Sequence, residues 1–138
     1  MEILLVKSDE YSKYYKKLKE VLDKENKETN YSVGIVDLIS NAPYFHFITV
    51  ENDEPLGIAT VIFFHEIFKL YVVPEKRKSH VASELVKHTM SFLKTNDEHS
   101  LFIEYTEQSK IFWEQFLLKN KLDYIFYRGQ SKFSIKLK

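Results

Sequence analysis

The chain contains 138 residues, of which 44% are hydrophobic and 15% aromatic, so it has enough apolar material for one domain with a sizeable core. Its 20 basic side chains are balanced by 20 acidic ones, which argues against a dedicated nucleic-acid-binding protein because such proteins carry a basic excess. The lack of cysteine excludes disulfides, thiolate catalysis and cysteine-bound metal. We therefore expect a single domain over residues 1–138.

The sequence gives no sign of a membrane partner. No apolar run reaches the length of a membrane span, and residues 1–6 are too short and too acidic for a signal peptide. We therefore expect a cytoplasmic protein.

The first 40 residues predict one strand and two helices. Residues 2–6 form the strand, and Ser8 can cap a helix whose apolar positions recur at helical spacing; these positions are Tyr11, Tyr14, Tyr15, Leu18, Val21 and Leu22. Residues 23–29 read as a charged loop or a frayed helix end. Asn30 can then cap a shorter helix that reaches Ile39, although Gly34 weakens it by roughly 1 kcal/mol relative to alanine.

Three strands joined by tight turns are predicted next, over residues 44–50, 56–64 and 67–73. Such closely spaced strands favour an antiparallel meander. The strand over 56–64 is apolar on both faces, so it should lie inside a sheet that is covered on both sides. The strand over 67–73 stops at Pro74, which cannot donate to a sheet ladder.

A short basic loop separates that third strand from a helix that starts near Val81. The first backbone N–H groups of a helix lack internal partners and carry partial positive charge, so a phosphate can sit at that end. Lys76, Arg77 and Lys78 would add formal charge around it. The simpler alternative is that these side chains are merely solvated in a surface loop.

The remaining residues predict a helix to about Lys94, a strand over 101–105, a helix starting at Thr106, and a hairpin of strands over 122–127 and 133–137. The complete order is β-α-α-β-β-β-α-β-α-β-β. We therefore predict an α/β (α+β) fold with a central mixed, mostly antiparallel sheet of six to seven strands, flanked by about four helices.

Residues 72–82 resemble the acyl-coenzyme A signature of the GNAT N-acetyltransferase superfamily, in which a strand ending in V-x-P is followed by R/Q-x-x-G-x-G/A. Val72-Val73-Pro74 matches the strand end, and Arg77 and Ala82 match the first and last loop positions. His80 replaces the usual central glycine, so it could crowd a phosphate or, if protonated, pair with it. The predicted element order is also that of the GNAT fold, so the resemblance covers nearly the whole chain.

The resemblance implies an acetyl-CoA-dependent N-acetyltransferase that moves an acetyl group to a primary amine by direct attack. The acceptor would be an amine-bearing small molecule, a protein N-terminus or a lysine, and a homodimer is compatible with the family. Acetyl-CoA would act as co-substrate, held by Leu70, Tyr71, Val72, Arg77, Lys78, Ser79, His80, Val81, Ala82 and Ser83.

The resemblance also suggests catalytic residues. Glu66 is our choice of general base, and His65 is the second choice, although both residues could simply occupy a solvated turn. Trp113 stands where the family often has a tyrosine that protonates the leaving thiolate, and an indole cannot serve as a proton donor. Tyr105 could take that role, or it could be buried by strand alternation.

Other classes of protein fit less well. The chain lacks the family's glycine at position 80 and its tyrosine at position 113. It could therefore be a GNAT-fold protein that has lost catalysis and binds another protein. A modifier of nucleic acid or of its bound proteins is a weaker alternative. The scattered histidines lack zinc-site spacing, so we expect no metal. The chain has neither the G-x-S-x-G elbow of serine hydrolases nor the G-x-G-x-x-G of Rossmann nucleotide sites.

Overall fold

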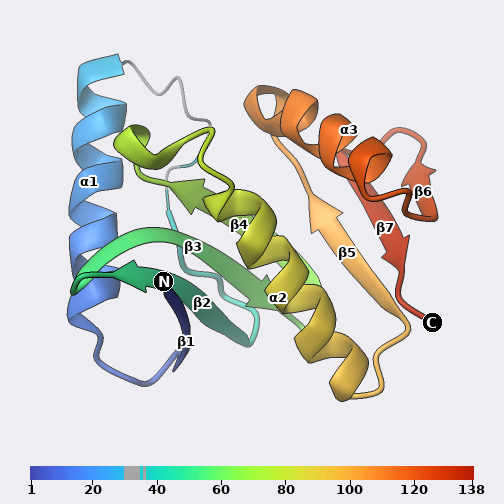
Figure 1. Ribbon diagram of the computed structural model, residues 1–138, viewed down its shortest axis with the longest axis horizontal. Coiled ribbons are helices and arrows are strands. Elements are labelled where there is room, and N and C mark those ends of the chain that lie inside the picture. The colour runs from blue at the N-terminus through green and yellow to red at the C-terminus, as the bar shows by residue number, and fades with distance from the viewer. Residues whose placement is uncertain (30–34, 36) are drawn as a thin grey trace.

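A seven-stranded sheet forms the centre of the computed structural model, which describes residues 1–29, 35 and 37–138 (Figure 1). The strand order is β1-β2-β3-β4-β5-β7-β6, and only β4 and β5 pair in parallel. The mixed, mostly antiparallel sheet is confirmed. The strands are β1 (Glu2–Lys7), β2 (Tyr44–Glu51), β3 (Glu54–Ile62), β4 (Glu66–Val72), β5 (Ser100–Glu104), β6 (Tyr124–Tyr127) and β7 (Lys132–Lys136).

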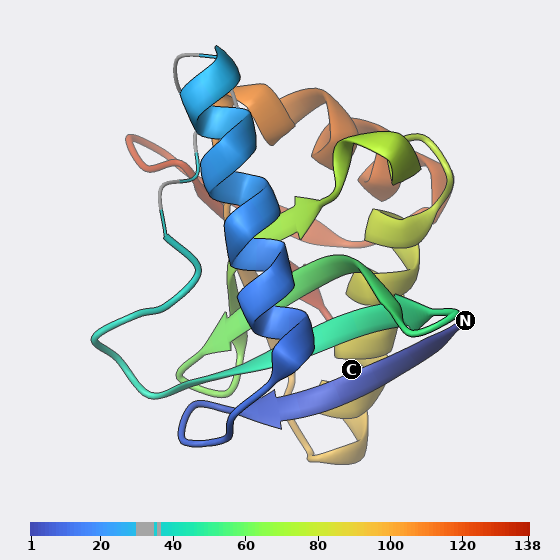
Figure 2. The ribbon, with the colours of Figure 1, turned by 90° about the vertical axis from the view of Figure 1, so that its left-hand side faces the viewer.

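Within the described residues, three α-helices cover the sheet: α1 (Lys13–Thr29), α2 (Val81–Thr95) and α3 (Lys110–Lys119). Helix α1 crosses one face, and α2 and α3 lie on the other (Figure 2). Each face has its own apolar cluster: Leu18 and Leu22 of α1 belong to one, and Leu85 of α2 and Phe116 of α3 belong to the other. Strand β3 is buried from its second residue onward, as expected for a strand covered on both faces. No helix in the described part of the chain is long and apolar enough to cross a membrane.

Helix α1 differs from its predicted bounds at both ends. Ser8 lies in a turn, and the Ser12 hydroxyl instead accepts a hydrogen bond from the Tyr15 backbone N–H at 3.2 Å, so Ser12 caps the helix. Residues 23–29, predicted as a loop or frayed end, are helical. Of the short helix predicted from Asn30, residues 30–34 and 36 lie outside the described residues, and 37–40 are not helical.

Strand β4 carries the feature that shapes the site. Its register against β3 steps from Lys69–Thr60 to Ile67–Val61, so Phe68 is an extra residue and forms a β-bulge. On its other side, β4 pairs with β5 only at Glu66–Phe102 and Ile67–Ile103. Beyond these two pairs the strands diverge (Figure 1). The last residues of β4 therefore have no strand partner on the β5 side.

The start of α2 is fixed by its close contact with β3. A Cβ atom at Gly57 would lie 2.9 Å from Val81 Cγ1 and 3.1 Å from the Tyr71 carbonyl oxygen. Only glycine allows β3 to approach the first turn of α2 this closely. The end of β4 and the start of α2 are thus held side by side.

A buried histidine on β2 should make folding sensitive to acid. His46 is 3% exposed, its Nδ1 lies 2.9 Å from Thr60 Oγ1, and its ring stacks on Tyr15. Burial lowers the pKa of His46 to about 4. The unfolded chain therefore binds the proton more readily, so the contribution of His46 to stability is present above about pH 6.5 and is lost as the pH falls toward 4.

We expect acidification from about pH 7.5 to about pH 5 to reduce the free energy of unfolding by about 2 kcal/mol through His46 alone. Urea unfolding of the wild type and of His46→Gln at both pH values measures this, because the difference between their pH dependences isolates the histidine. Equal pH dependence in the two proteins would contradict it.

Candidate active site

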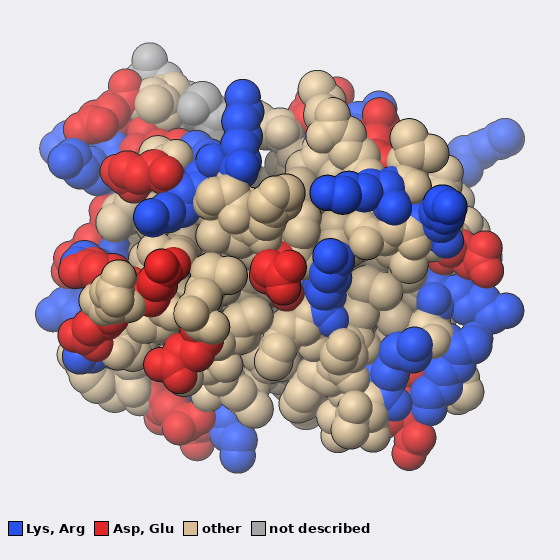
Figure 3. Space-filling model, viewed as in Figure 1, with Lys and Arg blue, Asp and Glu red and all other residues tan. Residues whose placement is uncertain are grey.

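A cleft of about 660 Å³ opens where β4 and β5 diverge. Its walls are the second half of β4, the loop and first turn that lead into α2, the end of β5, and the start of α3. The basic loop thus meets a groove that reaches between the two strands. Basic and acidic side chains are both present on the face shown in Figure 3, so this face does not carry charge of a single sign.

The α2 end of the cleft has the geometry of an anion site. Helix α2 starts at Val81, and no side chain in the described ranges caps it. The N–H groups of its first turn, including those of Ala82 and Ser83, are therefore available to a ligand in the cleft. Lys76, Lys78 and His80, which also line the cleft, are exposed and cationic or able to become so.

His80 adopts the conformation that glycine would normally supply. Its φ is 70° and its ψ is 8°, in the left-handed region, and Lys78 also has a positive φ of 65°. Histidine enters this region more readily than most residues but at a cost in free energy. The loop therefore takes its turn without glycine, and the imidazole remains on the surface.

The structure brings together nearly all of the predicted cofactor-binding residues. Leu70, Tyr71, Val72, Arg77, Lys78, His80, Val81, Ala82 and Ser83 line the cleft. Ser79 is not among the described lining residues, and its hydroxyl donates to the Lys76 carbonyl oxygen. The sequence did not single out Glu25 and Glu104, which also line the cleft.

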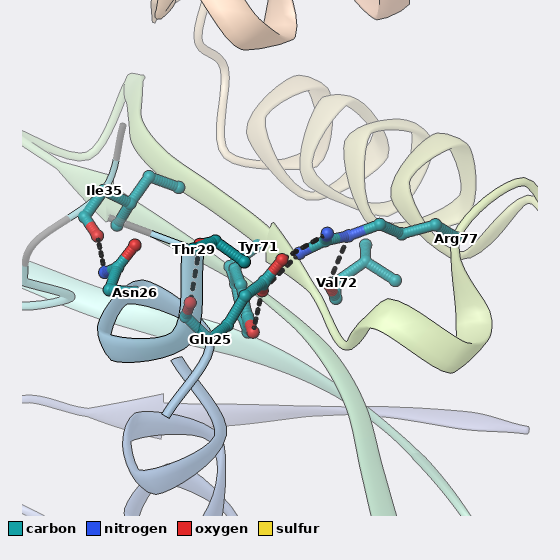
Figure 4. Close-up of polar contacts among 7 residues, drawn as sticks. All are labelled: Glu25, Asn26, Thr29, Ile35, Tyr71, Val72 and Arg77. Carbon is teal, nitrogen blue, oxygen red and sulfur yellow. Dashed lines mark hydrogen bonds and ion pairs between the residues drawn. The ribbon is translucent and has the colours of Figure 1, made fainter. Parts of the chain in front are cut away.

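Arg77 is engaged by the protein itself (Figure 4). Its Nη1 and Nη2 lie 2.6 and 2.7 Å from the two carboxylate oxygens of Glu25, and its Nε donates to the Val72 carbonyl oxygen at 3.0 Å. The Tyr71 hydroxyl donates to Glu25 at 2.7 Å, and the guanidinium lies over the Tyr71 ring at 5.5 Å. The residue expected to meet a phosphate is thus bound bidentately by α1.

These contacts set the ionisation of the cluster. Burial alone would raise the pKa of Glu25, but the hydrogen bonds from Arg77 and Tyr71 and the guanidinium charge together lower it below its usual value. The hydrogen bond to Glu25 raises the pKa of Arg77 further. Burial, followed by the hydrogen bond to Glu25, raises the pKa of Tyr71 above its ordinary value. A carboxylate, a guanidinium and a neutral phenol are the forms present at neutral pH.

Glu66 lies at the start of β4, outside the described lining of the cleft. It is 6% exposed; Lys132 Nζ is 3.4 Å from its Oε1, and its buried Oε2 has no hydrogen-bond partner among the described residues. Because side chains alternate along a strand, Glu66 lies on the sheet face opposite Ile67, which packs in the α2 cluster.

The other candidate catalytic positions are occupied by aromatic packing. Tyr105 is not among the described lining residues, and its ring contacts Phe126 and Phe133. Trp113 does line the cleft but is 3% exposed, because it packs against Phe116 and Phe133. The structure therefore does not gather Glu66, Tyr105 and the loop around a single point. Among the described residues, no group of His, Asp and Glu side chains is arranged to hold a metal ion.

A strand that ends before Pro74, a short basic loop and a helix N-terminus without a side-chain cap are the features on which the GNAT resemblance rested. The model of the Acetyltransferase (GNAT) family matches residues 7–117. The chain therefore belongs to the GNAT acetyltransferase family. A search of curated protein sequences finds no match.

Solved structures of low sequence identity share the fold. A GNAT-family acetyltransferase from Staphylococcus aureus Mu50 aligns with a TM-score of 0.64 and 16% identity, over 99% of this chain and 100% of that one. Tetrahymena GCN5 aligns with a TM-score of 0.69 and 10% identity, over 100% of this chain and 97% of that one. A mutant AtaT toxin bound to the C-terminus of the antitoxin AtaR aligns with a TM-score of 0.60 and 12% identity, over 99% and 92%.

Substitutions at His80 should separate the effect of its left-handed backbone conformation from the effect of its imidazole. His80→Gly removes the cost of the left-handed conformation, whereas His80→Ala keeps that cost and removes the imidazole. We therefore expect the glycine variant to be more stable than the alanine variant by about 1 kcal/mol, despite the greater freedom of glycine in the unfolded chain. Denaturant unfolding of the two variants measures the difference. Equal stability would show that the loop bears no strain at this position.

Proposed function

We propose that this protein is an acetyl-CoA-dependent N-acetyltransferase that moves an acetyl group to a primary amine by direct attack. The observation that carries the proposal is the cleft beside the unpaired end of β4, which meets the uncapped start of α2. One end of the cleft offers amide donors for phosphates, and the other end offers backbone of β4 that has no partner on the β5 side. Membership of the GNAT family supports acyl transfer as the chemistry.

The residues of the cleft fit acetyl-CoA. The amides at the start of α2 would hold the pyrophosphate, with Lys76 and Lys78 adding positive charge around it. Residues 70–72 have no partner on the β5 side, and their backbone facing the cleft would hold the pantetheine arm and orient the thioester. When bound, acetyl-CoA would supply the acetyl group as an activated thioester.

Glu66 would supply the base. An amine reaches the enzyme mainly as an ammonium ion and must lose a proton before its nitrogen can attack. The unpartnered Oε2 of Glu66 supports this role, and because Glu66 does not line the cleft, a water molecule would relay the proton. The leaving thiolate must in turn gain a proton. Tyr105 is the donor that the sequence suggests, and its packing against Phe126 and Phe133 makes solvent the simpler source.

A protein-binding role without catalysis is the second candidate, and one surface favours it. Strand β6 lies at the edge of the sheet, and its consecutive residues Tyr124, Ile125 and Phe126 are 48%, 63% and 46% exposed. An exposed apolar edge strand is suited to pairing with another chain. The open cleft nevertheless supports the enzyme, because a protein that only bound partners would not need it.

A negative charge in the first turn of α2 should block acetyl-CoA while preserving the fold. Ser83→Glu places a carboxylate beside the amides that would hold the pyrophosphate, where it also interacts favourably with the helix dipole. We expect the thermal midpoint to be unchanged or raised and the affinity for acetyl-CoA to fall at least tenfold, by roughly 1.4 kcal/mol or more. Isothermal titration calorimetry with acetyl-CoA measures the affinity.

Ser91→Glu is the matched control, because it makes the same change at an exposed position further along the same helix. It should bind acetyl-CoA like the wild type. Failure of the wild type to bind acetyl-CoA would overturn the proposed function and direct attention to the β6 surface.

Replacing the base should affect turnover and leave cofactor binding intact. We expect Glu66→Gln to lower kcat by roughly 10²- to 10⁴-fold, because the amide cannot accept the proton from the amine. The dissociation constant for acetyl-CoA should stay within error of the wild-type value. Thiol release from acetyl-CoA is followed across a panel of small amines and peptides with free N-termini or lysines. Wild-type kcat in the glutamine variant would remove Glu66 from the mechanism.

A further inference from the structure

A network around Glu25 links three separate parts of the fold at the edge of the cleft. Glu25 lies in the C-terminal half of α1, Tyr71 lies near the end of β4, and Arg77 lies in the loop before α2. The Glu25 carboxylate accepts hydrogen bonds from both of the other side chains (Figure 4). All three residues line the cleft.

All three nitrogens of the Arg77 guanidinium make a hydrogen bond inside this network. Both terminal nitrogens contact Glu25, and Nε binds the Val72 carbonyl oxygen at the end of β4. The Glu25 side chain is only 12% exposed. A bidentate, partly buried pair of this kind is geometrically specific and holds its partners far better than an exposed single contact.

The network fixes the path of the loop. After β4 the chain passes through the 3₁₀ turn Pro74–Lys76, then Arg77, and then two left-handed residues, Lys78 and His80, before α2 begins. Left-handed residues other than glycine persist only where the surroundings hold them. Arg77 is the residue of this loop that is anchored to both α1 and β4.

We propose that Glu25 is a positioning residue for acetyl-CoA binding, which acts through Arg77 to hold the loop so that the first amides of α2 face the cleft. Arg77 then acts as a strut that holds the loop against α1 and β4, and not as a phosphate ligand. The formal charge near the phosphates comes from Lys76 and Lys78. This proposal rests on the proposed function for its ligand, but the strut itself can be tested in the free protein.

The two roles of Arg77 predict opposite effects of removing the Glu25 charge. If Arg77 binds phosphate, Glu25→Gln frees the guanidinium and tightens acetyl-CoA binding. If Arg77 is a strut, the same change loosens the loop, and we expect binding to weaken about tenfold. Arg77→Gln and Arg77→Lys should weaken binding to a similar extent, because lysine keeps the charge but cannot make the bidentate contact.

The double variant Glu25→Gln/Arg77→Gln tests whether the two residues act as one unit. Either single substitution already removes the contact between the two residues, so the second one has no further effect. The double variant should therefore bind acetyl-CoA no more weakly than either single variant. Calorimetry gives the four dissociation constants of the cycle. Independent, multiplicative losses would overturn the proposal, as would tighter or unchanged binding by Glu25→Gln.

Hydrogen exchange separates failure of the strut from failure of the proposed function. In the free protein, Glu25→Gln should speed exchange of the amides of residues 75–83, whereas exchange in β2 and β3 should stay unchanged. This readout does not need acetyl-CoA. Unchanged exchange over residues 75–83 would overturn the strut even if the wild type binds acetyl-CoA.

Asp53 provides a matched control at the other end of α1. Its carboxylate also receives a tyrosine hydroxyl and a cation, with Tyr14 at 2.6 Å and Lys13 Nζ at 3.2 Å, and it also ties α1 to the sheet. Asp53→Asn should leave acetyl-CoA affinity and exchange in residues 75–83 unchanged. A loss of affinity equal to that of Glu25→Gln would show a general effect of loosening α1 and would overturn a specific role for Glu25.

Discussion

The early end of pairing between β4 and β5 is the constraint on which the site depends. Two residue pairs are enough to join the two halves of the sheet, and the bulge at Phe68 then redirects β4 away from β5. The divergence leaves backbone N–H and C=O groups of β4 without a strand partner on the β5 side. A folded protein satisfies such groups with side chains, ligands or water, and Arg77 Nε does so at the Val72 carbonyl oxygen. The cleft is therefore a direct consequence of sheet geometry.

The elements around the opening follow from this geometry. Strand β4 ends at Val72, where Pro74 makes further pairing impossible, and the chain turns into α2. Gly57 lets α2 pack directly against β3, which sets the first turn of the helix beside the free end of β4. Amide donors from a helix end and from a strand end thus face a single space. This arrangement suits a ligand that has an anionic part and an extended polar arm.

The sequence predicted the sheet well because its strands are separated by strong turn and breaker residues. The predicted boundaries lie at Pro74, at the turn Glu51-Asn52-Asp53-Glu54-Pro55 and at the turn Arg128-Gly129, and the structure shares them to within about two residues. The predicted start of α1 was wrong because both Ser8 and Ser12 can cap a helix, and only the fold of the preceding turn selects Ser12. The continuation of α1 through residues 23–29 was missed because its charged residues carry little apolar periodicity.

The candidate site was predicted where it depends on local sequence, and was missed where it depends on tertiary contacts. Residues 70–83 are contiguous, so their grouping along the cleft follows from one strand–loop–helix unit. Glu25 lies 52 positions from Arg77, within a segment predicted as a charged loop or a frayed helix end, and no local pattern links the two residues. The environment of Glu66 likewise depends on Lys132, which is brought near only when β7 joins the sheet beside β5.

The two departures from the family motif differ in physical weight. Glycine at position 80 would serve mainly to permit a left-handed turn, and histidine adopts the same conformation with its ring outside the core, at a cost of about 1 kcal/mol. The loop shape is therefore kept despite the substitution.

Trp113 is different, because no rearrangement of an indole supplies the acidic proton of a phenol. In the proposed function, the reaction would therefore depend on removing a proton from the amine rather than on Trp113 as an acid for the thiolate. A thiol is acidic enough to leave as its thiolate near neutral pH, whereas an ammonium ion does not deprotonate so readily. In the proposed function, turnover should thus depend on Glu66, whose buried Oε2 has no hydrogen-bond partner in the part of the chain that the structure describes.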